Sequence, residues 1–195
     1  LAGSLFQPEG GAAAVLELYR SRGLEGALGA LNGDFALAIV DEAKQELHLA
    51  RDRFGVRPLY YWSGEGKLAY ASRMRSLFCL AEVPREIDRS FAGRFAGSHY
   101  RTFDNDPERS PFAAIRQLPA AHALTWKAGR ARLRRYWSLD AGRDHEADET
   151  LLAEEYRALL MDAVCIRLAR ARRPAFALSG GMDSSSVLAC AVQAS

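Results

Sequence analysis

The chain has 195 residues, of which 49% are hydrophobic, and its 26 Lys and Arg against 24 Asp and Glu leave a net charge of +2. This length can hold one large domain, or one domain and part of another, and the near-balance of charge argues against a nucleic-acid-binding protein that relies on bulk charge. No apolar run approaches the ~20 residues that span a bilayer, and three scattered cysteines (Cys79, Cys165 and Cys190) offer neither a disulfide framework nor zinc spacing, so we expect a cytoplasmic protein without a membrane anchor.

Helical patterns occur at three places before residue 100. Residues 12–22 carry an apolar face that stops at Gly23, a residue that suits the end of a helix. Ser72 is a good N-cap for a helix over 72–80, and a further helix is expected over 89–95. The rest of this region has the pattern of strands.

The predicted strands form hairpins. Pro58 lies inside one of them, which predicts an edge strand or a bulge there. Residues 97–111 are polar and rich in turn formers, and they predict an exposed loop. The expected strands are 35–41, 46–52, 56–62, 67–71, 121–127 and 130–137.

The composition changes after residue 137. Residues 138–150 are charged and nearly free of aliphatic side chains, which indicates a linker between domains. An amphipathic helix over 151–170 follows, and residues 175–178 read as a short buried strand. The apolar stripe of this helix consists of Leu152, Tyr156, Leu159, Leu160, Ala163, Val164 and Leu168.

The most informative stretch comes directly after this strand, at residues 177–186. It reads as a strand end, a glycine turn and a helix start, an arrangement that presents backbone N–H groups to an anion. Asp183 would repel a phosphate unless Mg²⁺ lay between them, so the loop suggests a metal–polyphosphate site, although an ordinary turn with a serine N-cap is the alternative. The stretch is Ala177-Leu178-Ser179-Gly180-Gly181-Met182-Asp183-Ser184-Ser185-Ser186.

This Ser-Gly-Gly-x-Asp-Ser-Ser loop resembles the pyrophosphate loop of ATP pyrophosphatases, and segments upstream narrow the resemblance to the glutamine-hydrolysing asparagine synthetase family. The family's Arg-Asp-x-x-Gly-x-x-Pro-Leu-Tyr segment is closely matched at residues 51–60. The landmarks that occur in the family's order are Leu31-Asn32-Gly33-Asp34-Phe35-Ala36-Leu37-Ala38, Ala71-Ser72-Arg73-Met74-Arg75-Ser76-Leu77, Gln117-Leu118-Pro119-Ala120-Ala121-His122 and Arg135-Tyr136-Trp137.

The resemblance implies an α+β chain with two domains. An Ntn-type αββα sandwich of the glutaminase kind, lacking its N-terminal part, would occupy residues 1–137, and residues 138–150 would be the linker. Residues 151–195 would begin an α/β ATP-pyrophosphatase domain, of the adenine nucleotide alpha hydrolase-like kind. The chain starts at Leu1 and stops about three turns into the helix after the loop, so we expect the whole protein to continue on both sides.

The family's reaction implies that ATP and Mg²⁺ activate a carboxylate as an acyl-adenylate, which ammonia from glutamine attacks, releasing AMP and pyrophosphate. The partners would be a small-molecule or peptide carboxylate and glutamine, ammonia or an internal amine, with a possible homodimer and no nucleic acid. Asp183 would be the metal-linked carboxylate. By resemblance, the ATP and pyrophosphate site would comprise Leu178, Ser179, Gly180, Gly181, Asp183 and Ser184.

The glutaminase half departs from the family's pattern. No catalytic residue is visible, because the family's nucleophile is an N-terminal cysteine and Leu1 stands first here. Gly10 and Gly11 fall where the family has the acid that binds the glutamine amine, and Glu9 is a candidate substitute. The alternatives are therefore an amine-using, ring-closing synthetase of the β-lactam synthetase or lasso-peptide macrocyclase type, or a non-catalytic glutaminase-like remnant.

The remaining polar residues favour structural roles. Arg51 and Asp52 are expected to fix a turn beside the sheet, and His122 to stabilise the start of a strand. His48 alternates with leucines and is expected on the outward face of its strand. Cys165 and Cys190 are expected to pack inside helices.

Overall fold

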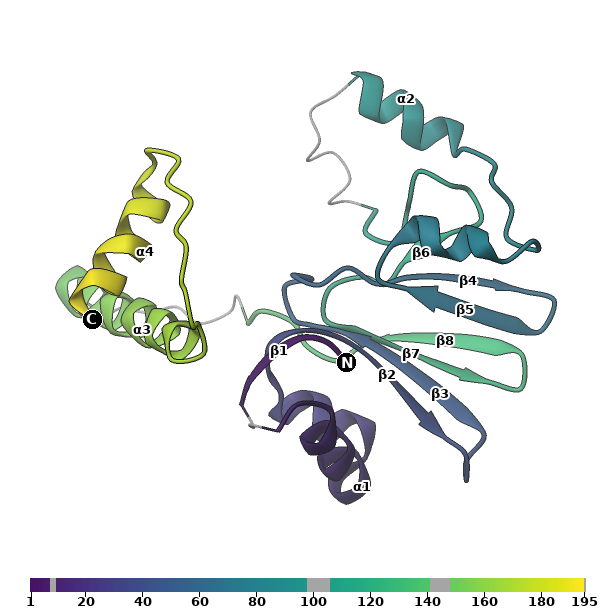
Figure 1. Ribbon diagram of the computed structural model, residues 1–195, viewed down its shortest axis with the longest axis horizontal. Coiled ribbons are helices and arrows are strands. Elements are labelled where there is room, and N and C mark those ends of the chain that lie inside the picture. The colour runs from purple at the N-terminus through teal and green to yellow at the C-terminus, as the bar shows by residue number, and fades with distance from the viewer. Residues whose placement is uncertain (8–9, 98–105, 141–147, 195) are drawn as a thin grey trace. The chain divides into compact units, whose positions relative to one another are not determined.

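The computed structural model describes residues 1–7, 10–97, 106–140 and 148–194, which divide into two compact units, Leu1–Leu139 and Asp140–Ser195 (Figure 1). The first unit contains two antiparallel sheets, and the second contains two helices. Together they give a mixed α+β chain, as the sequence predicts. Within the described residues, no helix has both the length and the apolar character that a membrane crossing requires.

The larger sheet has the strand order β1-β2-β3-β7-β8, so β7 returns to pair with β3 after the chain has built the smaller sheet. That smaller sheet has the order β5-β4-β6. The strands are β1 (Ala2–Gln7), β2 (Asn32–Asp41), β3 (Glu46–Arg51), β4 (Tyr60–Gly64), β5 (Lys67–Ala71), β6 (Arg116–Gln117), β7 (His122–Lys127) and β8 (Arg130–Arg135).

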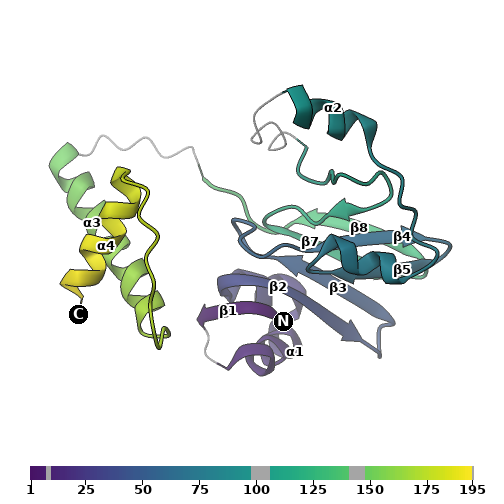
Figure 2. The same cartoon turned by 45° about the horizontal axis from the view of Figure 1, so that its top comes forward.

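The two sheets pack on each other, and each is covered on its other face, as Figure 2 shows. Side chains alternate along β2, so Phe35 and Leu37 face the helix α1 (Gly11–Ala30) while Ala36 faces the smaller sheet. On the far side of the smaller sheet, Trp62 packs with Leu77 of the 3-10 helix η1 (Met74–Cys79). The layers therefore run helix, sheet, sheet, helix.

The helix predicted over 12–22 is longer than expected and contains a break. Gly23 has φ 68° and ψ −177°, so α1 consists of two helical segments, before and after this residue. Only glycine adopts this backbone conformation without strain. Gly23 therefore ends the first helical segment, as the sequence predicts, but a second segment begins directly after it. The second segment, from Leu24 to Ala30, lies over the sheet in a new direction.

Two local predictions in the first unit were wrong. The helix expected over 72–80 is present only as the shorter 3-10 helix η1, and Arg73 rather than Ser72 takes the N-cap position, without a side-chain cap. The strand expected over 56–62 starts only at Tyr60, because the preceding residues fold around Asp52 in a turn. Pro58 therefore lies before the strand.

The prediction that His48 lies on an outward face was also wrong. Its ring is 4% exposed, and it lies under α1 with Nε2 at 3.1 Å from the Tyr19 hydroxyl and Nδ1 at 3.0 Å from Thr125 Oγ1. The leucines beside it face the smaller sheet, so both faces of β3 are covered and alternation could not tell outside from inside. His122 is structural as expected, since its Nδ1 donates to the Ala120 carbonyl at 2.7 Å.

The other elements follow the sequence closely. The strands predicted at 35–41, 46–52, 67–71, 121–127 and 130–137 are all present, with small shifts at their ends, and β1 and β6 were missed because they are a terminal and a two-residue strand. The helix α2 (Arg89–Gly97) confirms the prediction at 89–95. Residues 98–105 of the predicted loop, residues 141–147 of the predicted linker, and Glu9 lie outside the described residues.

The second unit is a pair of packed helices, α3 (Glu149–Leu168) and α4 (Met182–Gln193). Val164 is buried against Cys190, so the prediction that Cys190 packs inside holds, while Cys165 is half-buried. The carboxyl end of the apolar stripe on α3 packs on α4, whereas the amino end, with Leu152, Tyr156 and Leu159, is exposed.

Residues 175–178 do not form the predicted strand. A strand needs a neighbour to accept and donate its backbone hydrogen bonds, and no described segment of this unit pairs with these residues. They run as an extended segment into the glycine turn, and Phe176 and Leu178 are 38% and 57% exposed.

Candidate functional site

The glycine turn before α4 has the backbone that an anion-binding loop requires. Gly180 has φ +79°, in the left-handed region, and a Cβ there would meet nothing within 4 Å. Gly181 is the N-cap of α4 with an extended backbone, so the helix begins at Met182. The first N–H groups of a helix have no acceptor within the helix, so the start of α4 can offer donors to an anion.

Serine hydroxyls hold this turn in shape. Ser184 Oγ donates to the Gly181 carbonyl at 3.1 Å and accepts from the Ser179 backbone N–H at 3.3 Å. Ser179 Oγ lies 3.2 Å from Ser184 Oγ and accepts from the Gly181 backbone N–H at 3.3 Å. The structure therefore brings together three of the residues that the sequence assigned to one site, and it does so through contacts across the turn.

Asp183 lies in the first turn of α4 and is exposed. No group of three or more metal-ligating side chains exists among the described residues, so any cation here would depend on few protein ligands. Mg²⁺ commonly binds through one or two carboxylates and otherwise through phosphate oxygens and water. One exposed carboxylate beside an anion-binding turn therefore fits a magnesium ion that arrives with a polyphosphate.

An apolar hollow of about 570 Å³ runs along α4 beside the turn. It contains Ser185 of α4, whose hydroxyl donates to the Gly181 carbonyl at 2.9 Å. Leu178, the first residue of the predicted site, lies in the same hollow and makes no polar contact through its side chain. The full lining is Leu178, Ser185, Leu188, Ala189, Val192 and Gln193.

In the first unit, the sequence singled out Asp52, and the structure buries it with 1% of the residue exposed. Its Oδ1 accepts from the backbone N–H groups of Phe54 at 3.1 Å and Val56 at 2.9 Å, and its Oδ2 accepts from that of Arg57 at 3.0 Å. A buried carboxylate that accepts three main-chain hydrogen bonds is not accessible to a substrate. Asp52 is structural, as the sequence predicted.

Arg51 completes the same turn with its guanidinium group. It donates to the carbonyls of Gly55 at 2.6 Å, Arg57 at 2.7 Å and Leu118 at 2.8 Å. Gly55 has φ +66°, and a Cβ at this position would lie 3.0 Å from Arg51 Cζ. The glycine is therefore required by both its backbone angle and the close approach of the arginine.

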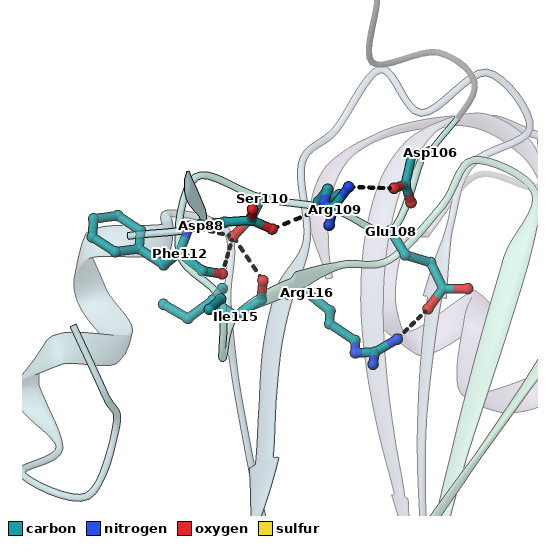
Figure 3. A pocket seen from close by; sticks show the side chains of 9 residues that line it. Asp88, Asp106, Glu108, Arg109, Ser110, Phe112, Ile115 and Arg116 are labelled. Carbon is teal, nitrogen blue, oxygen red and sulfur yellow. Dashed lines mark hydrogen bonds and ion pairs between the residues drawn. The ribbon is translucent and has the colours of Figure 1, made fainter. Parts of the chain in front are cut away.

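A polar pocket of about 260 Å³ lies beside this turn, and Figure 3 shows its ion pairs. Arg109 bridges Asp88, at 2.8 Å, and Asp106, at 3.3 Å, while Arg116 pairs with Glu108 at 3.2 Å. A hydrogen bond from the Phe91 backbone and the ion pair with Arg109 lower the pKa of Asp88. Every carboxylate here therefore has a cationic partner.

Ser110 is the one hydroxyl in this pocket, and it is 2% exposed. It donates to the carbonyls of Ile115 at 2.7 Å and Phe112 at 3.0 Å, and it accepts from the Phe112 N–H at 3.1 Å. No histidine lines the pocket to activate it as a nucleophile. No local sequence pattern indicates this pocket, because it forms only where Asp88 meets the segment 106–116.

The cysteine nucleophile of the resembled family has no counterpart in the described part of the chain. Cys79 is exposed in η1, and the other two cysteines lie in the helices of the second unit. Gly10 and Gly11 lie at the start of α1 with φ 112° and 60°, and neither carries a side chain that could bind an amine. Glu9 lies outside the described residues.

Comparison with known proteins gives two matches along the chain. Residues 1–137 match the family described as Glutamine amidotransferase domain, and residues 155–195 match the family described as Asparagine synthase. Similar proteins include asparagine synthetase [glutamine-hydrolyzing] 3 of Bacillus subtilis, 30% identical over 83% of this chain and 26% of that protein, and asparagine synthetase [glutamine-hydrolyzing] 2 of the same organism, 32% identical over 89% and 24%.

A protein with a different name is equally similar. Amidase chyE of Penicillium rubens is 32% identical over 89% of this chain and 25% of its own length. The chain thus spans about a quarter of the length of these three relatives. The match to the first family covers most of the larger unit, and the match to the second includes the whole glycine turn.

Proposed function

This chain belongs to the glutamine-hydrolysing asparagine synthetase family and carries its glutamine amidotransferase domain, and from that premise we propose that the whole protein is an ATP-dependent, amide-forming ligase. It activates a carboxylate by adenylation and transfers to it an amine that derives from glutamine. The products besides the amide are AMP and pyrophosphate. In this proposal the chain supplies most of the glutaminase-like domain and the pyrophosphate loop of the synthetase domain.

The observation that carries the proposal is the geometry of the turn at residues 179–184. Two serine hydroxyls bond across the turn, Gly180 takes the left-handed conformation, and the turn ends at a helix N-terminus. Backbone N–H groups and hydroxyls in this arrangement suit a pyrophosphate group, whose charge is favoured by the helix dipole. The turn lies inside the segment that matches the Asparagine synthase family.

The chemistry of adenylation assigns roles to four residues of the turn. The substrate carboxylate attacks the α-phosphorus of ATP, the bond between the α- and β-phosphates breaks, and pyrophosphate leaves with the electron pair. Ser179, Gly181 and Ser184 hold the leaving pyrophosphate, and Asp183 holds the Mg²⁺ that neutralises it. When bound, the metal ion supplies Lewis-acid stabilisation of the charge that develops on the leaving group.

Exchange of labelled pyrophosphate into ATP by the full protein tests this assignment, because it measures adenylation without the later amine attack. The variant Asp183→Ala should lower exchange by about 100-fold, the usual effect of removing one stabilising group from such a site. Asp162→Ala is the matched control, since Asp162 is an exposed aspartate on α3. Equal exchange in both variants would refute the role of Asp183.

The source of the amine has a second candidate, which Gly10 and Gly11 favour. Because both glycines occupy the position where the family carries an acid for the glutamine amine, an internal amine of the substrate could replace ammonia in a ring-closing synthetase. Measurement of glutamate release from glutamine separates the two. Release that is coupled to amide formation supports the glutamine-dependent ligase, whereas exchange without glutaminase activity supports ring closure.

The proposal also covers the domain organisation, the cellular location and the oligomeric state. We infer an Ntn-type αββα sandwich for residues 1–137, a linker at 138–150, and the start of an ATP-pyrophosphatase domain at 151–195. The helix–sheet–sheet–helix layering supports the first of these assignments. A cytoplasmic homodimer that acts on a small-molecule or peptide carboxylate is the form in which we expect the protein to work.

A further inference from the structure

A groove of about 380 Å³ lies in the first unit between the second segment of α1 and strands β7 and β8. The break at Gly23 directs this segment over the sheet, so Leu24 and Glu25 form one rim of the groove. Neither the turn at residues 179–184 nor the pocket of Figure 3 includes any of its residues. The lining is Leu24, Glu25, His48, Ala123, Thr125, Arg132 and Arg134.

The far wall of the groove is strongly basic because of β8. This strand has the sequence Arg-Ala-Arg-Leu-Arg-Arg, and it is an edge strand of the larger sheet. Residues two apart on a strand share a face, so Arg130, Arg132 and Arg134 line up on the side that α1 covers. Arg132 pairs in register with Thr125, which in turn pairs with His48, so these side chains form one row across three strands.

The two arginines of the groove differ in their partners. Arg134 forms an ion pair with Glu25, whose side chain is 73% exposed. Arg132 is exposed and has no carboxylate partner among the described residues. An exposed ion pair is weak because water screens it, so an incoming anion can displace Glu25 at low cost. The groove therefore offers two guanidinium groups and only one weakly held competitor.

The floor of the groove is rigid and polar. His48 is 4% exposed, its Nδ1 lies 3.0 Å from Thr125 Oγ1, and its Nε2 lies 3.3 Å from a carboxylate oxygen of Glu46. This network fixes the Thr125 side chain beside Arg132. A hydroxyl oxygen and two guanidinium groups thus converge on one open space, which is the set of groups that recognises a phosphate.

We propose that this groove binds a small phosphate-bearing anion through the guanidinium groups of Arg132 and Arg134, with Thr125 as a third contact. A phosphate group has at least three terminal oxygens and can accept bidentate bonds from two arginines, whereas a carboxylate satisfies only one. Two arginines spaced by about 7 Å along a strand also match a phosphate or pyrophosphate better than a single oxygen atom.

A different explanation of the arginines is protection of the sheet edge. Charged side chains on an edge strand discourage pairing with another chain, and any arrangement of arginines on β8 achieves this. Binding of an anion, by contrast, depends on the face. Arg135 lies on the same strand but points to the opposite side from Arg132 and Arg134 by the alternation of the strand, and it provides the matched control.

Titration of the protein with inorganic phosphate and with pyrophosphate at low, constant ionic strength tests the proposal, with acetate and chloride as controls for carboxylate and for screening. Isothermal titration calorimetry gives the affinity. The ring signals of His48 in ¹H–¹³C spectra, assigned among the four histidines with His48→Gln, locate the binding site. AMP in a further titration distinguishes the phosphate of a nucleotide from the free anion.

The proposal predicts a pattern of phosphate affinities among the variants that protection of the sheet edge alone would not produce. We expect Arg132→Ala to weaken binding about tenfold, Glu25→Gln to strengthen it several-fold by removing the competitor, and Arg135→Ala to change it less than twofold. Equal weakening by Arg132→Ala and Arg135→Ala, or a response to chloride as large as that to phosphate, would overturn the proposal. So would phosphate binding that leaves the His48 signals unchanged.

Discussion

Two glycine-containing turns in this chain each carry an aspartate, and the two carboxylates lie in opposite surroundings. Asp52 is 1% exposed and accepts three main-chain hydrogen bonds, whereas Asp183 is exposed in the first turn of α4, directly after the glycine turn. The first carboxylate accepts hydrogen bonds from its own backbone, whereas the second is exposed to solvent. The comparison teaches that a glycine turn can bury its acid to stabilise the fold or leave it exposed to solvent.

The comparison predicts its largest effect at Asp52. We expect Asp52→Ala to destabilise the first unit by about 3 kcal/mol, because three main-chain N–H groups lose their acceptor and the buried Arg51 guanidinium loses its counter-charge. All three tryptophans lie in this unit, so fluorescence during urea unfolding reports it alone. An unchanged midpoint would show that the turn does not depend on its carboxylate.

Gly55 tests how closely the same turn is packed. Gly55→Ala should cost about 2 kcal/mol, since it combines a left-handed φ of +66° with a Cβ at 3.0 Å from Arg51 Cζ and 3.1 Å from Ala120 Cβ. Gly66→Ala is the control, because Gly66 has φ +72° but open space around a Cβ. The two unfolding free energies should differ by about 1 kcal/mol, and equal costs would remove the argument from close approach.

His48 adds a pH dependence to the stability of the first unit. Burial lowers the pKa of His48 and outweighs the carboxylates of Glu46 and Asp41, which raise it. The unfolded chain therefore binds more protons than the folded one below pH 6.5, so the stability that His48 contributes is present above that pH and is lost as the pH falls.

The variant His48→Gln should flatten the loss of stability between about pH 6.5 and 5.5, before the carboxylates titrate. Urea midpoints by tryptophan fluorescence across this range measure the slope. His122→Gln serves as the control, because His122 is less buried and makes its one hydrogen bond to the nearby Ala120 carbonyl. Parallel slopes in the wild type and His48→Gln would contradict the cause assigned here.

The smallest effect is expected at Asp183. Asp183→Asn should leave the tryptophan-detected transition unchanged and weaken α4 by about 0.5 kcal/mol, through the lost interaction with the helix dipole. Circular dichroism gives the second value. A large loss of stability would place Asp183 with Asp52 as a structural residue and end the contrast between the two turns.

The sequence predicted the helices and strands well where a hydrophobic pattern is compatible with only one type of element. The hairpins at β2–β3 and β7–β8 and the helices α1 and α3 follow from alternation and amphipathic spacing. It also predicted the structural role of Arg51 and Asp52, although not that the acceptor of Arg51 is the distant Leu118 carbonyl. The turn at 179–184 was expected as a loop, and its cross-turn serine contacts were not visible in the sequence.

The failures have physical causes at particular residues. The prediction put His48 on a solvent-exposed face because alternation assumes that one face of a strand contacts water, whereas both faces of β3 are covered. Residues 175–178 have a strand's composition but no pairing partner in the described part of their unit. The pocket around Arg109 joins Asp88 to the segment 106–116, and the groove at Arg132 depends on the bend at Gly23, so both rest on contacts between distant residues that local spacing does not show.

The contact between Arg51 and the Leu118 carbonyl joins residues 67 positions apart, and the strands β3 and β7 pair at the same place. Closing a loop of this size costs entropy before any contact compensates for it, so the meeting of β7 with β3 should limit the rate at which the first unit folds. Arg51 then acts on kinetics as well as on structure. Its removal should slow refolding more than it accelerates unfolding, because the arginine secures the step at which the two halves of the sheet meet.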